Sequence, residues 1–196
     1  MIPKVIHYCW FGGNPLPESA RQCIASWRKY MPGYEIKEWN ESNFDVASIA
    51  YTREAYRLKK YAFVSDYARF CILYREGGLY FDTDVELIAP LHDIVERGPF
   101  MGCEARQDGH DAGGSCIVAP GLGLGAPAGL ELYEHIIDWY RSHHFVTWDG
   151  KFTGTVVDVV SNLLASLPAR QLENGLRQVG DIFIYPPEYF CPKNYF

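Results

Sequence analysis

The sequence predicts a single α/β domain built on a mixed, mostly parallel sheet flanked by helices. Two short β-rich runs, 4–9 and 34–39, are separated by an amphipathic segment long enough to be a helical crossover. A longer helical pattern ends at two glycines and leads into another apolar run. The length of 196 residues suits one compact core, and no linker divides it.

The first three elements follow from local signals. Residues 4–9 are β-rich and are closed by Gly12 and Gly13, which predicts a strand followed by a loop. From about residue 17 to residue 30, Ile24, Trp27 and Tyr30 fall on one helical face, and the following Pro-Gly pair ends the pattern. Residues 34–39 then form a second strand, which we expect to be parallel to the first.

The middle of the chain predicts one long helix and one long strand. A helix over 52–76 carries an apolar stripe that includes Phe63, Tyr67 and Phe70, and Gly77 is placed to terminate it. A strand over 79–88 follows. Further strands are expected at 100–104 and 116–119, helices at 130–140 and 156–167, and a last strand in VGDIFIYPPEYF. The segment around Gly123 and Gly125 approximates a dinucleotide fingerprint, but Pro127 interrupts it and a loop is expected.

The amino-acid composition limits the classes of function that the protein can have. A formal charge of −6 offers no basic field for nucleic acid, although a bound cation would still allow a phosphorylated ligand. Six scattered cysteines without a CxxC pair argue against structural zinc and are expected to be reduced. The opening MIPKVIHYCWFGG lacks an apolar targeting segment, and no apolar run reaches about 18 residues. We therefore expect a cytoplasmic protein, with peripheral contact at the inner face of the membrane left open.

Two acidic residues stand out in the predicted strand 79–88. In an extended chain Asp82, Asp84 and Glu86 would share one face, so that like charges repel unless a cation lies between them. Oxygen ligands favour Mg²⁺, Mn²⁺ or Ca²⁺, and the first two commonly complete their shell with substrate phosphates. The alternative is the solvated face of an edge strand. The position of the acidic pair at the end of a predicted strand favours a metal site over a solvated face, because ligands of open α/β sheets bind beyond the carboxyl ends of strands.

Three further residues are candidates for binding. Asp66 and Arg69 lie three residues apart in an otherwise apolar helix, where they form either a structural ion pair or a pair of hydrogen-bonding groups for a sugar. Trp10 follows the first strand and precedes two glycines. It is either a core residue or a ring that stacks on a nucleobase.

Several motifs resemble a known family. IPKVIHYCWFGG, SDYARFCILYREGGLYFDTDVELIAP, FTGT and IYPPEYFCP occur in order across nearly the whole chain. Together they resemble the bacterial DXD sugar transferases of glycosyltransferase family 32, a group common in capsule and surface-polysaccharide synthesis. They are also similar to yeast-type outer-chain mannosyltransferases and, more distantly, to the glucosyltransferase domains of large bacterial cytotoxins.

The resemblance implies a GT-A fold, a nucleotide-diphosphate sugar donor, a Mn²⁺ or Mg²⁺ cofactor and hexosyl transfer with retention of anomeric configuration. Carried over by position, Trp10 stacks on the base, Asp66 and Arg69 hold the donor sugar, and Asp82 and Asp84 engage ribose, metal and diphosphate. The resemblance also assigns Tyr80 to the donor site. A UDP-sugar is expected ahead of a GDP-sugar, with a glycan or another hydroxyl compound as acceptor.

The sequence also departs from the family pattern. Thr155 stands where the related element T-G-P has proline, and related chains continue into a tail containing His and Trp, so we expect weaker metal binding here. The polar loop with Asp108, His110 and Asp111 could meet the acceptor or be a solvated turn. Two other functions remain alternatives: a haloacid-dehalogenase-like phosphotransferase and a non-catalytic sugar-binding module. The first usually carries its motif on the first strand.

Overall fold

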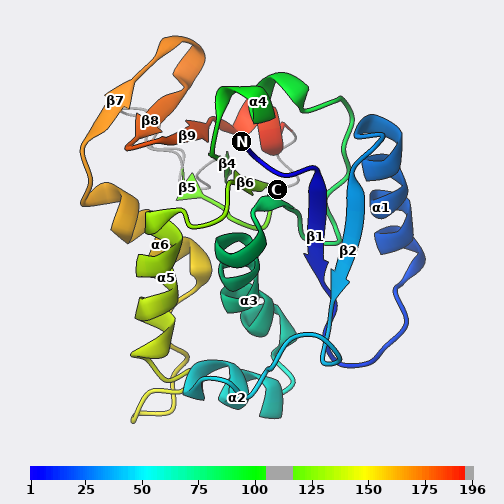
Figure 1. Cartoon of the computed structure of the whole chain (residues 1–196). Coiled ribbons are helices and arrows are strands. Elements are labelled where there is room, and N and C mark those ends of the chain that lie inside the picture. The colour runs from blue at the N-terminus through cyan, green and yellow to red at the C-terminus, as the bar shows by residue number, and fades with distance from the viewer. Residues whose placement is uncertain (105–116, 193–196) are drawn as a thin grey trace.

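The computed structural model describes residues 1–104 and 117–192. One mixed sheet runs through the molecule in the strand order β2-β1-β3-β6-β4-β9-β8-β7, and β5 pairs with β4 beside this path. Its strands are β1 (Val5–Cys9), β2 (Glu35–Trp39), β3 (Gly78–Tyr80), β4 (Phe100–Glu104), β5 (Ile117–Val118), β6 (Leu124–Ala126), β7 (Ala169–Gln171), β8 (Arg177–Val179) and β9 (Ile182–Tyr185). The helices are α1 (Glu18–Tyr30), α2 (Ala50–Arg57), α3 (Tyr61–Glu76), α4 (His92–Arg97), α5 (Glu131–Arg141), α6 (Val156–Ala165), a 3-10 turn (Glu173–Gly175) and α7 (Pro187–Phe190). Figure 1 shows helices against both faces of the sheet, so the predicted α/β class is confirmed.

The parallel part of the sheet begins at the N-terminus, as predicted. Strand β1 is parallel to β2, with Val5 opposite Glu35, and parallel to β3, with Ile6 opposite Leu79. Helix α1 is the crossover between β1 and β2. Beyond β3 the direction alternates, because β6 is antiparallel to both β3 and β4, whereas β9 is parallel to β4. Because β2, β1 and β3 are adjacent and parallel, the carboxyl ends of these three strands lie at one edge of the sheet.

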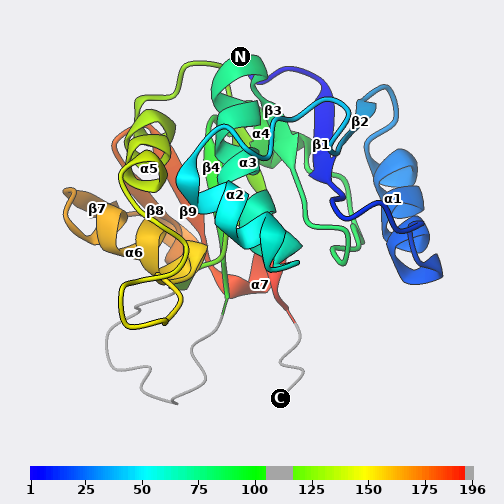
Figure 2. The same cartoon turned by 90° about the horizontal axis from the view of Figure 1, so that it is seen from below.

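Alternation along β1 divides the core in two. Ile6 and Tyr8 belong to a cluster with Trp27 of α1, while Cys9 belongs to a larger cluster with α3 and α5. Seen from below, α1 lies beyond β1 and β2 at one end of the molecule, and α5 and α6 lie at the other end (Figure 2). Burial on both faces explains why the β1 sequence is almost continuously apolar.

The single helix expected over 52–76 is wrong, because the chain forms two helices there. Helix α2 ends at Arg57 and α3 begins at Tyr61, and between them Lys59 adopts a positive φ of 57°. No glycine or proline marks this break in the sequence. The break brings the Tyr61 ring against Gly12, where an added Cβ would overlap that ring. A contact between distant segments thus accompanies the interruption of a locally helical pattern.

The strand expected over 79–88 is also wrong in its extent. Strand β3 covers Gly78–Tyr80 only, after which the amide of Asp82 donates to the carbonyl of Gly121 at 2.9 Å. The amide of Val85 then donates to the carbonyl of Asp82 at 3.1 Å and closes a turn. Asp82 and Asp84 therefore lie in a turn at the end of a strand. The argument that they share one face of an extended strand does not hold.

Two strand pairings in the second half of the chain were not predicted from the sequence. The segment expected to be a loop forms β6, where an added Cβ on Gly125 would overlap the Phe100 ring. Strands β7 and β8 form an antiparallel hairpin that no strong local signal marks. The cysteine prediction is confirmed for Cys9, Cys23, Cys71 and Cys191, which are reduced, and is wrong for Cys103, which is disulfide-bonded. Cys116 lies outside the described residues. No helix within 1–104 or 117–192 is long and apolar enough to cross a membrane.

Candidate functional site

The candidate site lies where β1 and β3 end. Parallel pairing of His7 with Tyr80 places the residues after both strands at the same edge of the sheet, with Trp10 after β1 and Asp82 after β3. The amide of Phe81 still donates to the carbonyl of His7, at 3.3 Å, so the segments of β1 and β3 stay side by side up to this edge. Helix α3 runs past it and contributes Asp66 and Arg69. Carboxyl ends of parallel strands are where α/β proteins commonly bind ligands.

Arg69 joins the helix to the strand end. Its Nη2 atom donates to Oδ1 of Asp66 at 2.7 Å and lies 3.3 Å from Oδ1 of Asp82. Its Nε atom donates to the carbonyl of Ser65 at 3.1 Å, which fixes the side chain along its own helix. The guanidinium also lies 4.9 Å from the centroid of the Tyr80 ring. The ion pair between Asp66 and Arg69 therefore forms, and Arg69 also contacts the acidic motif. The sugar-binding interpretation of this pair stays a prediction.

Burial governs the charges of this group. Asp66 is 8% exposed and Arg69 is 2% exposed. Burial raises the pKa of Asp66 to about 6, although the nearby guanidinium of Arg69 opposes the rise. The desolvation cost of a buried carboxylate thus exceeds what its ion pair returns. For Arg69, burial lowers the pKa, but Asp82, Tyr80 and Asp66 together raise it above its usual value, so the side chain stays charged.

Tyr80 and Gly121 shape the position of Asp82. The buried Tyr80 hydroxyl donates to Oδ1 of Asp82 at 3.0 Å, and burial raises the pKa of that hydroxyl. On the other side, an added Cβ on Gly121 would overlap Oδ2 of Asp82. The backbone near Gly121 can therefore approach the carboxylate only because this residue has no side chain. The side chain of Asp82 remains 36% exposed and so stays accessible from solvent.

Asp84 differs from Asp82 in its surroundings. It is exposed, and it makes no hydrogen bond or ion pair with any residue in the described parts of the chain. Those parts contain no group of three His, Cys, Asp or Glu side chains that could hold a metal ion. Two carboxylates fit a Mg²⁺ or Mn²⁺ ion that completes its shell with water and phosphate oxygens. Asp84 is thus the residue most available to such an ion, whereas Asp82 is shared with Arg69.

Trp10 is held firmly at the edge of the site. Its amide donates to the carbonyl of Trp39 at 2.8 Å, and its Nε1 atom donates to the carbonyl of Asn14 at 2.6 Å. The ring is partly buried against the cluster that includes Trp27. Part of the ring therefore serves packing, and its orientation is fixed by a loop closed through Asn14. This geometry keeps both the core and the stacking interpretations of Trp10 open.

Residues that sequence reasoning missed lie behind Asp66. Tyr51 of α2 and Tyr140 of α5 are both fully buried, and their hydroxyls have no hydrogen-bond partner among residues 1–104 and 117–192. Burial raises the pKa of each, and the charge of Asp66 adds to the rise. Their sequence positions carry no signal of this proximity, because each fits an apolar helical stripe. Gly121 was missed as well, although the glycine-rich run GLGLG allows close approach of the backbone.

Other candidates lie elsewhere. His7 is a hydrogen-bonded core histidine, as expected, because its Nε2 atom contacts the carbonyl of Gly77 at 2.9 Å. Thr155 caps α6 in a reciprocal hydrogen-bonding arrangement with Asp158. Asp108, His110 and Asp111 lie outside the described residues. A hollow of about 570 Å³ lies beside the β7–β8 hairpin and contains none of the predicted site residues. It is lined by Arg97, Arg170, Gln171, Leu172, Glu173, Asn174, Leu176, Tyr185 and Tyr189.

Comparison with protein families identifies the acidic motif. Residues 17–101 match the family model described as a glycosyltransferase sugar-binding region containing a DXD motif. The matched range includes Asp66, Arg69, Tyr80, Asp82 and Asp84 and ends just after β4 begins. The match covers less than half of the chain, and it is a similarity to the DXD-type sugar-binding region of glycosyltransferases.

Curated relatives are consistent with that class. The chain is 30% identical to the uncharacterized glycosyltransferase L373 of Acanthamoeba polyphaga mimivirus, over 52% of this chain and 43% of that protein. It is 27% identical to inositol phosphoceramide mannosyltransferase 1 of Schizosaccharomyces pombe, over 51% of this chain and 33% of that protein. It is 28% identical to subversion of eukaryotic traffic protein A of Legionella pneumophila, over 48% of this chain and 19% of that protein. The alignments thus span less than half the length of these relatives.

A solved structure supports the fold class. The PaToxG glycosyltransferase superposes with a TM-score of 0.56 at 18% sequence identity, covering 83% of this chain and 69% of that one. At this identity the likeness concerns the fold, which is of the GT-A class.

Proposed function

We propose that the protein is a metal-dependent, retaining glycosyltransferase that moves a hexose from a nucleotide-diphosphate sugar to a hydroxyl group of a glycan or another acceptor. The observation that carries this proposal is Arg69, one buried guanidinium that contacts both Asp66 and the first acid of the DXD motif. The same residues lie in the matched DXD region. The retaining course and the family 32 assignment rest on the motif resemblance.

In this proposal each residue acts on one part of the donor. Asp66 accepts hydrogen bonds from sugar hydroxyls, and Arg69 orients Asp66 and places positive charge beside the sugar. Asp84, with Asp82, would hold Mn²⁺ or Mg²⁺, which when bound neutralises charge on the departing nucleoside diphosphate. Tyr80 holds Asp82 in place through its hydroxyl. Trp10 offers the exposed part of its ring to the base.

The alternatives fit the geometry less well. A haloacid-dehalogenase-like phosphotransferase needs its first aspartate free as a nucleophile, but Oδ1 of Asp82 accepts from Tyr80 and lies next to Arg69. The motif also follows the third strand of the chain rather than the first. A non-catalytic sugar-binding module would use the same side chains and differs only in lacking turnover. That alternative is decided by experiment.

The decisive experiment is donor hydrolysis, which needs no acceptor. Purified protein is incubated with Mn²⁺ and a panel of UDP-sugars and GDP-sugars, with UDP-sugars favoured, and the products are followed by proton NMR. We expect slow release of nucleoside diphosphate and a sugar whose first-formed anomer matches the donor. The Arg69→Lys variant keeps the charge but loses the bidentate geometry and should release far less product.

Each outcome has a distinct meaning. Binding of a donor without any release over many hours would favour the sugar-binding module. Initial release of the opposite anomer would contradict the retaining course and leave the glycosyltransferase class in place. Equal turnover with EDTA in place of Mn²⁺ would contradict the metal requirement.

A further inference from the structure

A group of exposed aromatic, aliphatic and basic side chains lies at the end of the molecule where α2 stops and the chain between α5 and α6 turns. We call it the hairpin patch. It consists of Leu58, Lys59, Lys60, Trp148 and Phe152. Trp148 is 99% exposed, and Phe152 and Leu58 are about half exposed, at 50% and 49%. Figure 1 shows α2 and the yellow chain that follows α5 side by side at the lower end.

The exposure of Trp148 comes from an ordered turn. Val146 and Phe152 form an antiparallel bridge, and the amide of Thr147 donates to the carbonyl of Lys151 at 2.8 Å. The amide of Gly150 donates to the carbonyl of Thr147 at 2.9 Å and closes the turn at the tip. The indole at position 148 is therefore presented on a hydrogen-bonded hairpin. Leaving so large an apolar ring in water is costly without a partner.

The base of the hairpin is fastened to α2 and to Lys60, which follows the end of that helix. The carboxylate of Glu54 accepts from the amide of Phe145 at 3.0 Å and contacts Nδ1 of His144 at 2.6 Å. Phe152 stacks on Phe145 with ring centroids 4.8 Å apart, and the Nζ atom of Lys60 lies 5.5 Å from the Phe152 centroid. The base of the hairpin therefore keeps a fixed relation to α2 and to Lys60.

The charge around the patch is positive although the chain as a whole is acidic. Arg57, Lys59 and Lys60 are exposed, and within the described residues none of them forms an ion pair. The acids nearby are already engaged, because Asp149 pairs with Lys151 and Glu54 pairs with His144. An exposed tryptophan at the tip of the hairpin, with free lysines at the end of α2 on the same end of the molecule, matches the interface of an anionic bilayer, where indole rings enter the headgroup region and lysines meet lipid phosphates.

We propose that the hairpin patch docks the protein on an anionic lipid surface. The Trp148 side chain is 99% exposed, whereas a glycan subsite would need a concave, hydrogen-bonding surface around it. The patch also borders the candidate site, because Lys60 precedes Tyr61, whose ring packs on Gly12 next to the Trp10 loop. Docking in this way would face the site toward the lipid surface. The inference does not depend on sugar transfer.

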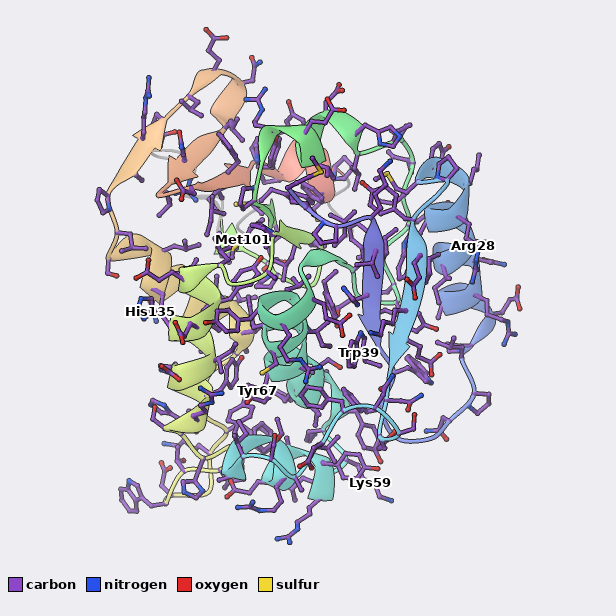
Figure 3. The ribbon with its side chains drawn as sticks, viewed as in Figure 1. Arg28, Trp39, Lys59, Tyr67, Met101 and His135 are labelled. Atoms are coloured by element: carbon purple, nitrogen blue, oxygen red, sulfur yellow. The ribbon has the colours of Figure 1, made fainter. Side chains whose placement is uncertain are left out.

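The test uses the full chain and vesicles without any donor. Binding is measured by co-sedimentation with vesicles of phosphatidylcholine alone and of phosphatidylcholine with phosphatidylserine, at low and at physiological salt. We expect binding to the mixed vesicles, weakened by salt, and at least about tenfold weaker in W148S and in the K59E/K60E double variant. The matched control is R28E/K29E, because α1 carries exposed basic residues away from the patch. Figure 3 shows Arg28 and Lys59 well separated.

The control variant should bind within about twofold of the unmodified chain, and thermal unfolding establishes that every variant is folded. Equal binding to both vesicle types, or binding that W148S and K59E/K60E leave unchanged, would overturn the proposal. Concentration-dependent dimerisation that W148S abolishes, seen by analytical ultracentrifugation, would assign the patch to a second copy of the chain instead. None of these outcomes bears on donor hydrolysis.

Discussion

At the scale of single residues, one buried arginine organises the acidic groups of the candidate site. Arg69 is fixed by Ser65 of its own helix and shared between Asp66 and Asp82, with its tighter contact to Asp66. Asp84, two residues beyond Asp82, has no such partner among the described residues. The two acids of the motif therefore differ in what they can do, which the tripeptide alone does not reveal.

We predict that Asp84→Asn removes the stabilisation that Mn²⁺ and a nucleoside diphosphate together give to the protein. The amide keeps the size of the side chain but is a much poorer ligand for a hard divalent ion. The measurement is a thermal-shift titration with UDP at fixed Mn²⁺. Glu86→Gln is the matched control, since Glu86 is also exposed and lies two residues further on, and it should keep the full shift. Equal shifts in Asp84→Asn and the unmodified chain would remove Asp84 from the metal site.

A second prediction concerns the free energy of folding that is lost by burying the ionised side chain of Asp66. Because burial raises its pKa from 3.8 to about 6, the favourable contribution of the protonated side chain to folding is present below pH 3.8 and is lost as pH rises through about 6. Asp66→Asn stays neutral, so its stability relative to the unmodified chain should increase between pH 4 and pH 7. The increase is up to about 3 kcal/mol, because the pKa of about 6 already includes the attraction of Arg69.

Urea denaturation at a series of pH values measures this difference. Asp93→Asn, at an exposed position, controls for the general effect of removing one negative charge. A difference between Asp66→Asn and the unmodified chain that stays flat from pH 4 to pH 7 would contradict the raised pKa. Loss of donor hydrolysis together with increased stability would indicate that the charge is retained for function.

At the scale of elements, amphipathic patterns predicted helices and the first strands well, and failed where long-range contacts interrupt them. Helix α5 is shifted by one residue from its expected range, and α1 begins one residue later than expected and ends where expected. The break at Lys59 and the early end of β3 have no local signal, because the first accompanies packing of Tyr61 on Gly12 and the second follows from pairing of Asp82 with Gly121. Short strands such as β6 are recognisable only through their partners.

The start of α6 offers a prediction at this scale. Thr155, which occupies the place of the expected proline, accepts from the amide of Asp158, and the Asp158 carboxylate accepts from the amide of Thr155. Thr155→Ala should lower the free energy of unfolding by about 1 kcal/mol, while Thr155→Ser should retain most of it. Urea denaturation checks both. Donor binding that falls in Thr155→Ala and is restored in Thr155→Ser would instead give this residue a role in the site.

At the scale of the whole molecule, His7 connects β1 to both of its neighbours. Trp39 of β2 can only donate, so Nδ1 of His7 accepts its Nε1 hydrogen at 3.0 Å, and Nε2 donates to the carbonyl of Gly77 before β3. Burial lowers the pKa of His7 below 6.5, so the neutral ring is required in the folded state. The stability that this gives is present above pH 6.5 and is lost as pH falls through the lowered pKa.

We therefore predict that acid destabilises the protein starting near pH 6.5. The titration of His7 makes the free energy of unfolding fall as the pH falls, whereas the titration of Asp66 makes it rise. The Asp66→Asn background isolates the histidine, because it removes the opposing titration. In that background, adding His7→Asn, which preserves an acceptor for Trp39, should reduce the loss of melting temperature between pH 6.5 and pH 5. The same loss with and without His7 would assign the acid sensitivity to other groups. The expected cytoplasmic location is a separate question and stays a prediction.

The sequence by itself determined the α/β class, the parallel start of the sheet and the candidate residues Trp10, Asp66, Arg69, Asp82 and Asp84. These follow from periodicity, breakers and short motifs, all of which are local or come from resemblance. Only the tertiary structure decided that Arg69 joins Asp66 to Asp82, that Asp84 stands apart, and that Trp148 projects from a hairpin whose Phe152 ring contacts Lys60. The physical reason is that burial, and with it the cost of a charge or an exposed ring, depends on which distant segments meet.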